Sequence, residues 1–291
     1  MMNSAFRVPI LIIAFNRPKT TEKLYEVIKK IKPKDLFVSF DAPRSGNISD
    51  EKNCSKVQDI FNSIDWDCRV RKFYHNSNVG CDKSVVGAIN WFFEQVDEGI
   101  ILEDDCLPDT SFFAFCDILL NKYRTDERIM MISGDNFLSH YYSSEDSYLF
   151  SRYALIWGWA TWKRAWSKYD NKMSTYAEFV SSKKINGVFS NFIQRAFWNI
   201  IFYKRYYGYN TAWDSKWTYA LLVNSGMCIA PTVNLVENIG FDENATNTKE
   251  KAQKRYRIKA ESIPLPLNHP AIIMVDNNYD AKTFNRVFVP M

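Results

Sequence analysis

The sequence of 291 residues contains no glycine-rich phosphate loop. Its ten glycines form neither the G-x-G-x-x-G fingerprint of dinucleotide-binding folds nor the G-x-x-x-x-G-K-S/T loop of P-loop proteins. A bound nucleotide would therefore have to be held by side chains and a metal ion.

Histidine and paired cysteine are also scarce. The three histidines, at positions 75, 140 and 269, offer little material for a histidine-based metal site or a Ser/His triad. The six cysteines include no C-x-x-C pair, which argues against a zinc cluster and a disulfide framework. We therefore expect reduced thiols, as in a cytosolic protein.

Long apolar runs are missing as well. No stretch approaches the roughly 20 apolar residues that span a bilayer. The run Val8–Phe15 has the length of a signal-peptide core, but Asn16-Arg17-Pro18-Lys19 follows where a small-residue cleavage site should be. The net charge of +4 is too mild for a protein that coats nucleic acid. These features predict a cytoplasmic protein without a nucleic-acid partner and with at most peripheral contact with the inner face of a membrane.

The chain does contain regularly alternating apolar patterns, and 46% of its residues are hydrophobic. Short apolar runs typical of buried strands alternate with stripes at helical spacing. This alternation predicts an α/β fold with a mostly parallel, doubly wound sheet, whose ligands bind beyond the carboxyl ends of the strands. The expected strands are 8–15, 36–40, 68–74 and 100–102, and the expected helical stripes are 24–31, 57–64 and 85–96.

Polar residues follow each of the four expected strands. They are Asn16 and Arg17 after the first strand, Asp41 after the second, Asn78 and Gly80 after the third, and Glu103-Asp104-Asp105 after the fourth. Because the carboxyl ends of parallel strands meet at one edge of a sheet, this pattern indicates a binding site there.

Glu103-Asp104-Asp105 is the sharpest element of that site. Three adjacent carboxylates at the end of a buried strand repel one another unless a positive partner is present. Mg²⁺ or Mn²⁺ is a natural partner, because both prefer oxygen ligands and are often held by only one or two carboxylates plus phosphates. The alternative is a solvated acidic turn before a helix at 109–123, with Asp109 or Thr110 as its N-cap.

Four segments together resemble N-acetylglucosaminyltransferase I and its bacterial relatives, which are GT-A glycosyltransferases. The segments are Val38–Asp41, His75–Gly80, Ile101–Asp105 and Ala212–Asp214, and the resemblance covers roughly residues 8–250. It implies a GT-A domain over 1–250, with a nucleotide-sugar half (1–135) and an acceptor half (136–250), followed by a C-terminal lid or packing segment over 251–291.

The same resemblance assigns roles to the strand-end residues. Asp105 would be the direct ligand of Mn²⁺ or Mg²⁺, and Asp104 and Glu103 would contact ribose and sugar hydroxyls. The nucleobase would lie between Asp41 and the first strand end, and the third strand end would approach the ribose and diphosphate. The residues concerned are Ala14, Asn16 and Arg17 at the first strand end, and Asn78, Gly80 and Lys83 after the third strand.

The residue chemistry agrees with two of these roles but leaves alternatives open. Gly80 lets the backbone come close to a ligand, and a cation at Lys83 would offset phosphate charge. Equally, Asn78-Val79-Gly80 can be an ordinary turn with a helix cap, and Lys83 a solvated helix residue.

Tryptophans dominate the second half of the chain. Trp157, Gly158, Trp159 and the later Trp213 suit stacking on the CH faces of sugars, and they are the predicted acceptor-binding residues. The alternative is a buried aromatic packing block. Asp214, between Trp213 and Trp217, is the candidate general base by the same resemblance, and its alternative role is the N-cap of a helix over 215–223.

Three further segments carry expectations. Residues 234–248 resemble the loop that closes over the diphosphate, but Asn247 stands where relatives often carry a histidine, which is the better metal ligand. The basic run 249–259 can be a solvated face, or it can contact phosphate or an anionic membrane surface. The aromatic-basic run 195–207 can be a core-packed helix, or it can contact the same membrane surface.

The function that these features favour is a metal-dependent, inverting glycosyltransferase. It would move a sugar from a UDP-sugar to a hydroxyl of a glycan or glycolipid acceptor in surface polysaccharide synthesis. A sugar-nucleotide nucleotidyltransferase is the first alternative, but a basic glycine-rich loop is expected after its first strand, where this chain has only Asn16-Arg17-Pro18-Lys19. A non-catalytic glycan-binding module is the second, and it would explain the tryptophans without explaining the acids.

Overall fold

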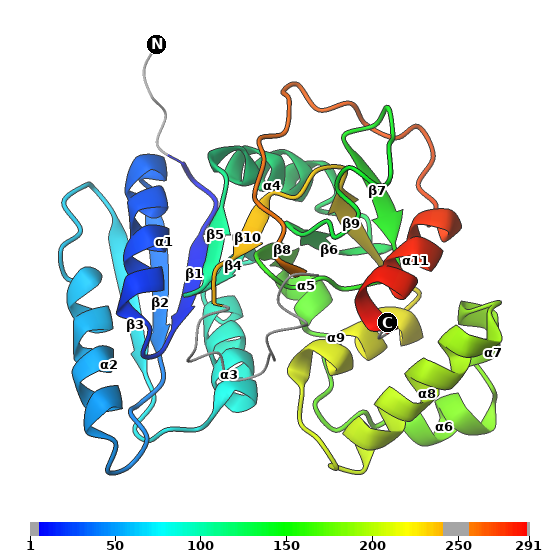
Figure 1. Ribbon diagram of the computed structural model, residues 1–291, viewed down its shortest axis with the longest axis horizontal. Coiled ribbons are helices and arrows are strands. Elements are labelled where there is room, and N and C mark those ends of the chain that lie inside the picture. The colour runs from blue at the N-terminus through cyan, green and yellow to red at the C-terminus, as the bar shows by residue number, and fades with distance from the viewer. Residues whose placement is uncertain (1–5, 241–255, 290–291) are drawn as a thin grey trace.

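The computed structural model describes residues 6–240 and 256–289. An eight-stranded sheet in the order β3-β2-β1-β4-β8-β6-β9-β7 runs through the middle of the described chain, with helices on both sides (Figure 1). Strands β3, β2, β1, β4, β6 and β9 run in the same direction, whereas β8 and β7 run against them. The predicted α/β fold with a mostly parallel sheet is confirmed.

The strands agree closely with the apolar runs of the sequence. The strands of the large sheet are β1 (Ile10–Ala14), β2 (Asp35–Phe40), β3 (Arg69–Tyr74), β4 (Glu98–Glu103), β6 (Ile129–Ser133), β7 (Tyr148–Ser151), β8 (Trp159–Trp162) and β9 (Met227–Pro231). A two-stranded antiparallel sheet joins β5 (Cys106–Pro108) to β10 (Val236–Asn238).

Strand β1 is covered by helices on both of its faces. Its side chains alternate, as those of any strand do, and every one of them is buried. Ile10 and Ile12 belong to the core shared with α1, α2 and α4, whereas Leu11 and Ile13 belong to the core shared with α3 and α9. A strand that buries both faces reads as a continuous apolar run, which is the pattern seen in the sequence.

The helices begin where the sequence supplies starting residues. Pro18 opens α1, the Asn47 side chain accepts a hydrogen bond from the Asp50 N–H (3.0 Å) at the start of α2, and Asp109 caps α4. The helices are α1 (Pro18–Ile31), α2 (Ile48–Ile60), α3 (Cys81–Phe93), α4 (Thr110–Lys122), α5 (Lys163–Trp166), α6 (Tyr176–Ser181), α7 (Ile185–Val188), α8 (Phe192–Tyr206), α9 (Trp213–Val223) and α11 (Asn277–Thr283), which continues into a π-helical turn, Phe284–Phe288.

Helices α6, α7 and α8 form a lobe at the lower right of the molecule, away from α1, α2 and α3 (Figure 1). Its interior is aromatic, and Trp198 and Phe202 of α8 pack there with Tyr219 of α9. The described C-terminal residues return to the large sheet, where Val275 pairs with Phe150 of β7 and the Ser151 hydroxyl donates to buried Asp280 (2.6 Å). The aromatic contacts thus join the lobe to α9, and the C-terminal contacts join the end of the described chain to β7.

Strand β10 brings a late part of the chain onto the acidic motif. The Ile239 N–H, just beyond this strand, donates to the Asp105 carbonyl (2.8 Å). A Cβ atom placed on Gly240 would lie only 2.2 Å from Asp105 Oδ2, so only glycine fits beside that carboxylate. The end of β4 is therefore enclosed by segments more than 100 residues apart in sequence.

Candidate functional site

The three acids lie at the carboxyl end of β4, and Arg17 from the end of β1 contacts two of them. The Arg17 guanidinium donates to Asp105 Oδ2 and lies 3.7 Å from Asp104 Oδ1. Asp104 is buried, and its Oδ2 accepts a hydrogen bond from the Phe15 N–H (2.9 Å). Glu103 and Asp105 are half-buried. The acids are thus not a solvated turn, and β5 separates them from the helix that Asp109 caps.

One guanidinium does not balance three carboxylates. Burial, followed by the charges of Asp105 and Asp104, raises the pKa of Glu103. Burial and Asp105 likewise raise the pKa of Asp104, although Arg17 works against both shifts. The pKa of Arg17 itself is raised, because the neighbouring acids outweigh the effect of its burial. Ionising all three acids together is therefore unfavourable beside one guanidinium, and a further cation would stabilise their ionised forms.

Asp214 lies in the first turn of α9. Its charge raises the pKa of Glu103, which places the two carboxyl groups within interaction range. Burial raises the pKa of Asp214, and Asp82 of α3 adds to the shift. Its Oδ1 accepts a hydrogen bond from the Ser215 N–H (2.6 Å), whereas the N-cap position belongs to Ala212. The alternative prediction that Asp214 caps this helix is therefore wrong by two positions.

Asp82 is an acid that the sequence analysis missed. It lies in the first turn of α3, half-buried, and its Oδ1 is buried with no hydrogen-bond partner among the described residues. The sequence signal that could have indicated Asp82 is its position two residues after Gly80, in the first turn of the helix that follows the third strand.

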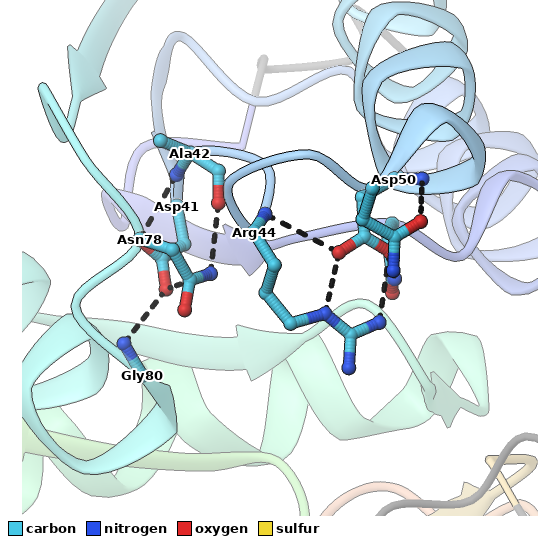
Figure 2. Close-up of polar contacts among 8 residues, drawn as sticks. Asp41, Ala42, Arg44, Asp50, Asn78 and Gly80 are labelled. Atoms are coloured by element: carbon cyan, nitrogen blue, oxygen red, sulfur yellow. Dashed lines mark hydrogen bonds and ion pairs between the residues drawn. The ribbon is translucent and has the colours of Figure 1, made fainter.

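Asp41, Asn78 and Gly80 come together as predicted, but much of their hydrogen-bonding capacity is used within the loop. Asp41 accepts hydrogen bonds from the Val79 N–H (3.1 Å), the Gly80 N–H (3.2 Å) and the Asn78 amide (3.2 Å). The bonds from Gly80 and Asn78 are at the left of Figure 2. The Asn78 amide also donates to the Ala42 carbonyl (2.8 Å). Asp41 therefore holds the loop after β3 against the end of β2.

Gly80 and Lys83 remain open toward solvent. Gly80 has a φ of +78°, which favours glycine, and a Cβ there would meet nothing within 4 Å. Lys83 is exposed in the first turn of α3. The open side of this turn leaves space for a ligand, so both assignments stay predictions.

A cluster of hydrogen bonds centred on Asp50, which we call the Asp50 hub, fixes the end of β1. The sequence did not predict it. Asp50 is buried and accepts hydrogen bonds from the Asn16 amide (2.7 Å) and from Arg44 Nε (2.5 Å) and Nη2 (2.8 Å), as the right side of Figure 2 shows for Arg44. The Arg44 guanidinium lies 5.8 Å from the centre of the Phe15 ring. Asn16 is therefore held by its own chain, and Ala14 is buried in β1.

The structure corrects the role expected of three acceptor-half residues. Trp159 and Trp213 are 1% and 5% exposed, and their rings stack on each other 5.9 Å apart within the core. Gly158 has a φ of +72°, and a Cβ there would lie 2.8 Å from Val236 Cγ2. Its close approach is to the protein's own chain rather than to a sugar. These three residues form the buried packing block that was the alternative prediction.

Trp157 is the remaining tryptophan of that prediction. It is half-buried, and its ring makes an edge contact with Phe137 at 5.1 Å. The backbone N–H of Trp157 donates to Oδ2 of Asp135 (2.9 Å), a buried acid whose pKa is raised far above its usual range by burial. Asn247 lies outside the described residues.

The donor set at the acidic motif fits a cation that arrives with a phosphate ligand. Within residues 6–240 and 256–289, no group of three His, Cys, Asp or Glu forms a ready-made metal cage. Asp105 offers carboxylate oxygens, of which Oδ2 contacts Arg17 and Oδ1 lies 3.8 Å from Cys106 Sγ. Mg²⁺ and Mn²⁺ are commonly held by one or two carboxylates with phosphate oxygens completing the shell, so Mn²⁺ or Mg²⁺ at Asp105 fits this arrangement.

The Asp50 hub generates a stability prediction with a defined pH dependence. Arg44 and Asn16 lower the pKa of Asp50 from its ordinary 3.8 to about 2. The stabilisation from this depressed pKa is complete above its ordinary value and is lost as pH falls through 2. Asp50→Asn should therefore lower the free energy of unfolding by about 1–3 kcal/mol at pH 7 and by less at pH 3, measured by urea unfolding.

Glu51→Gln is the matched control, because Glu51 is the exposed acid next to Asp50 on α2. It should change the free energy of unfolding by less than about 0.5 kcal/mol. Equal effects of the two substitutions, or an Asp50→Asn effect that is the same at both pH values, would contradict the role assigned to Asp50.

Comparisons with known proteins give structural neighbours only. No protein-family model matches this chain, and no curated protein matches its sequence. Similar solved structures include 4-diphosphocytidyl-2C-methyl-D-erythritol synthase from Anaerococcus prevotii (9% identity, TM-score 0.35, covering 60% of this chain and 76% of that one). A second is HddC from Yersinia pseudotuberculosis (9% identity, TM-score 0.32, covering 54% of this chain and 77% of that one). A third is a UDP-glucose pyrophosphorylase complexed with UDP-glucose (7% identity, TM-score 0.28, covering 51% of this chain and 64% of that one). TM-scores this low assign no activity, so function has to be inferred from the residues of this chain.

Proposed function

We propose that this protein is a metal-dependent glycosyltransferase that moves a sugar from a UDP-sugar to an acceptor hydroxyl. The observation that carries the proposal is the arrangement at the end of β4. There, three clustered carboxylates face a single guanidinium, and a fourth carboxyl group of raised pKa, Asp214, lies within interaction range. The proposal also draws on the resemblance of four short segments to N-acetylglucosaminyltransferase I.

Electrostatics explains why this site needs a cation to bind a nucleotide-sugar. Glu103, Asp104, Asp105, Asp214 and Asp82 all carry carboxyl groups, whereas Arg17 is the cation in direct contact with the motif in the described chain. An anionic diphosphate would be repelled by this group of acids. Asp105 would hold Mn²⁺ or Mg²⁺, which supplies the positive charge that the leaving diphosphate needs.

The strand ends provide places for the other parts of the donor. The nucleobase and ribose would lie between the end of β1 and Asp41, next to the open turn at Gly80. Asp104 and Glu103 would accept hydrogen bonds from ribose and sugar hydroxyls, and Lys83 would face the phosphates. Asp41 and Asp50 act on this region indirectly, because they hold the two loops that form its walls.

Asp214 would remove the proton from the acceptor. A carboxylate whose pKa is raised is a stronger base, and the Ser215 N–H fixes its Oδ1. The acceptor oxygen would form a bond to the anomeric carbon while the bond from that carbon to the diphosphate oxygen breaks. The proton passes to Asp214 and UDP leaves. A single displacement of this kind inverts the anomeric centre and needs no covalent intermediate.

The β1–α1 connection favours this reaction over nucleotidyl transfer. Only residues 15–17 separate the two elements, and none of the three is glycine. The cation in this connection, Arg17, already contacts Asp105 and Asp104. A nucleotidyltransferase has to bind a triphosphate or pyrophosphate in addition to the sugar phosphate, and this short connection offers few groups for that purpose.

A donor panel tests the proposed function. Incubation with UDP-sugars and Mn²⁺, without acceptor, should release UDP slowly from the preferred donor, because water can replace the acceptor hydroxyl. Formation of UTP from UDP-sugar and pyrophosphate, without UDP release, would instead establish a nucleotidyltransferase. Glycan binding with neither reaction would identify a binding module.

Two matched acids test the assignment of the base. Asp214→Asn should lower kcat by roughly 10²- to 10⁴-fold and leave UDP binding intact, because the amide cannot accept the proton. Asp82→Asn, which removes the neighbouring acid, should leave kcat near that of the unaltered protein. A large loss in Asp82→Asn with near-normal turnover in Asp214→Asn would assign the base to Asp82.

A further inference from the structure

Helix α8 has a second apolar face that no other described part of the chain covers. One face of the helix, with Trp198 and Phe202, is buried in the aromatic lobe. The opposite face exposes large apolar side chains. From position 193 onward they follow at intervals of seven, three and four residues, which keeps them on one side of a helix, and Phe192 lies next to the first of them. We call these the α8 stripe, and they are Phe192 (74% exposed), Ile193 (62%), Ile200 (55%), Tyr203 (48%) and Tyr207 (59%).

Positive charge is concentrated around the stripe. Residues 176–209, which span the lobe, contain five Lys and Arg against one acid, whereas the rest of the chain contains 32 Lys and Arg against 32 Asp and Glu. Lys204 on α8 and the pair Lys183-Lys184 just before α7 are exposed. Helices α6, α7 and α8, which share this lobe, lie together in Figure 1. The lobe is therefore strongly basic although the chain as a whole is nearly neutral.

Within residues 6–240 and 256–289, no helix is long and apolar enough to cross a membrane. The stripe and its basic surroundings instead match a helix that lies in a membrane interface. Such helices insert an apolar face shallowly and use Lys and Arg to attract anionic lipids. Tyrosine suits the boundary, because its ring is apolar and its hydroxyl can stay in contact with water.

From this match we propose that α8 docks the protein on an anionic lipid surface, with the α8 stripe facing the acyl chains. Charge favours a membrane over a second copy of the chain. A symmetric dimer through the stripe would bring two basic lobes together, and like charges repel. An anionic bilayer supplies both the apolar partner and the opposite charge.

Docking would also orient the candidate base. Helix α8 ends at Tyr206, and Asp214 follows eight residues later in α9. Arg205 Nε donates a hydrogen bond to the Ser215 hydroxyl (2.6 Å), which ties the end of α8 to the first turn of α9. Docking would thus hold Asp214 at a fixed place relative to the lipid surface in which a lipid-carried acceptor would lie. This orientation rests on the proposed function, whereas lipid docking itself does not.

The test is sedimentation of the full chain with lipid vesicles. Vesicles of phosphatidylcholine with about one-third phosphatidylglycerol should bind the protein, and pure phosphatidylcholine vesicles should bind it much less. Raising NaCl from about 0.1 M to about 1 M should weaken binding, because the Debye length falls from about 10 Å to about 3 Å. Binding is measured without nucleotide or acceptor, so its failure is separate from failure of the enzymatic proposal.

Two double variants with identical chemistry make the result specific. Ile193→Ser with Ile200→Ser removes apolar surface from the stripe and should lower the vesicle partition coefficient at least about tenfold. Ile48→Ser with Ile272→Ser changes two isoleucines that are 79% and 70% exposed elsewhere and should leave partitioning unchanged. Circular dichroism confirms that both remain folded, which is expected of exposed positions.

Three results would overturn the proposal. The first is no binding to the anionic vesicles, and the second is equal binding by the two double variants. The third is a dimer in sedimentation velocity that the stripe variant abolishes, without vesicle binding by the unaltered protein, because the occupant of the stripe would then be a second copy.

Discussion

The contact of Arg17 with Asp105 and Asp104 is the interaction on which the site depends. It joins the ends of β1 and β4, two neighbouring strands in the middle of the sheet, at the point where parallel strands present ligands. A single guanidinium leaves the three acids under-neutralised, so burial and mutual repulsion raise the pKa of Glu103 and of Asp104. Because the three acids exceed the single guanidinium in charge when ionised, binding of a divalent cation with its phosphate ligand would be favourable there. The proposed metal dependence thus rests on local charge as well as on the family resemblance.

Several contacts elsewhere in the structure hold Arg17 and the acidic motif in place. Asp41 and Asp50 fasten the loops after β3 and β2, and β10 brings Gly240 against Asp105, where no side chain would fit. The stacked tryptophans of β8 and α9 connect the sheet to the helix that carries Asp214. A buried aromatic block is stiff, because its large rings fill the space between the elements. Trp159 and Trp213 thus pack the helix that carries Asp214 against the sheet rather than offering their faces to a sugar.

Periodicity was sufficient to predict the parallel half of the sheet, β1 to β4, because β1 and β4 are buried on both faces and read as unbroken apolar runs. It also placed Arg17, Asp41 and the acidic motif at one edge. The packing of Trp159 and Gly158 could not be predicted, since a tryptophan-rich segment has the same sequence whether its rings face one another or a ligand. Asp50 was missed for a related reason. A polar residue in the first turn of α2 resembles any helix start until the fold brings Asn16, 34 positions earlier, into contact with it.

The central claim is that Asp105 binds a nucleotide diphosphate only through a metal ion. Isothermal titration of UDP in the presence and absence of Mn²⁺ tests it most directly, with Asp105→Asn and the exposed α4 residue Asp117→Asn as a matched pair. We expect UDP binding that depends on Mn²⁺ in the unaltered protein and in Asp117→Asn, and that is lost in Asp105→Asn. Equal UDP affinity with and without Mn²⁺, or unchanged Mn²⁺-dependent binding in Asp105→Asn, would contradict the account.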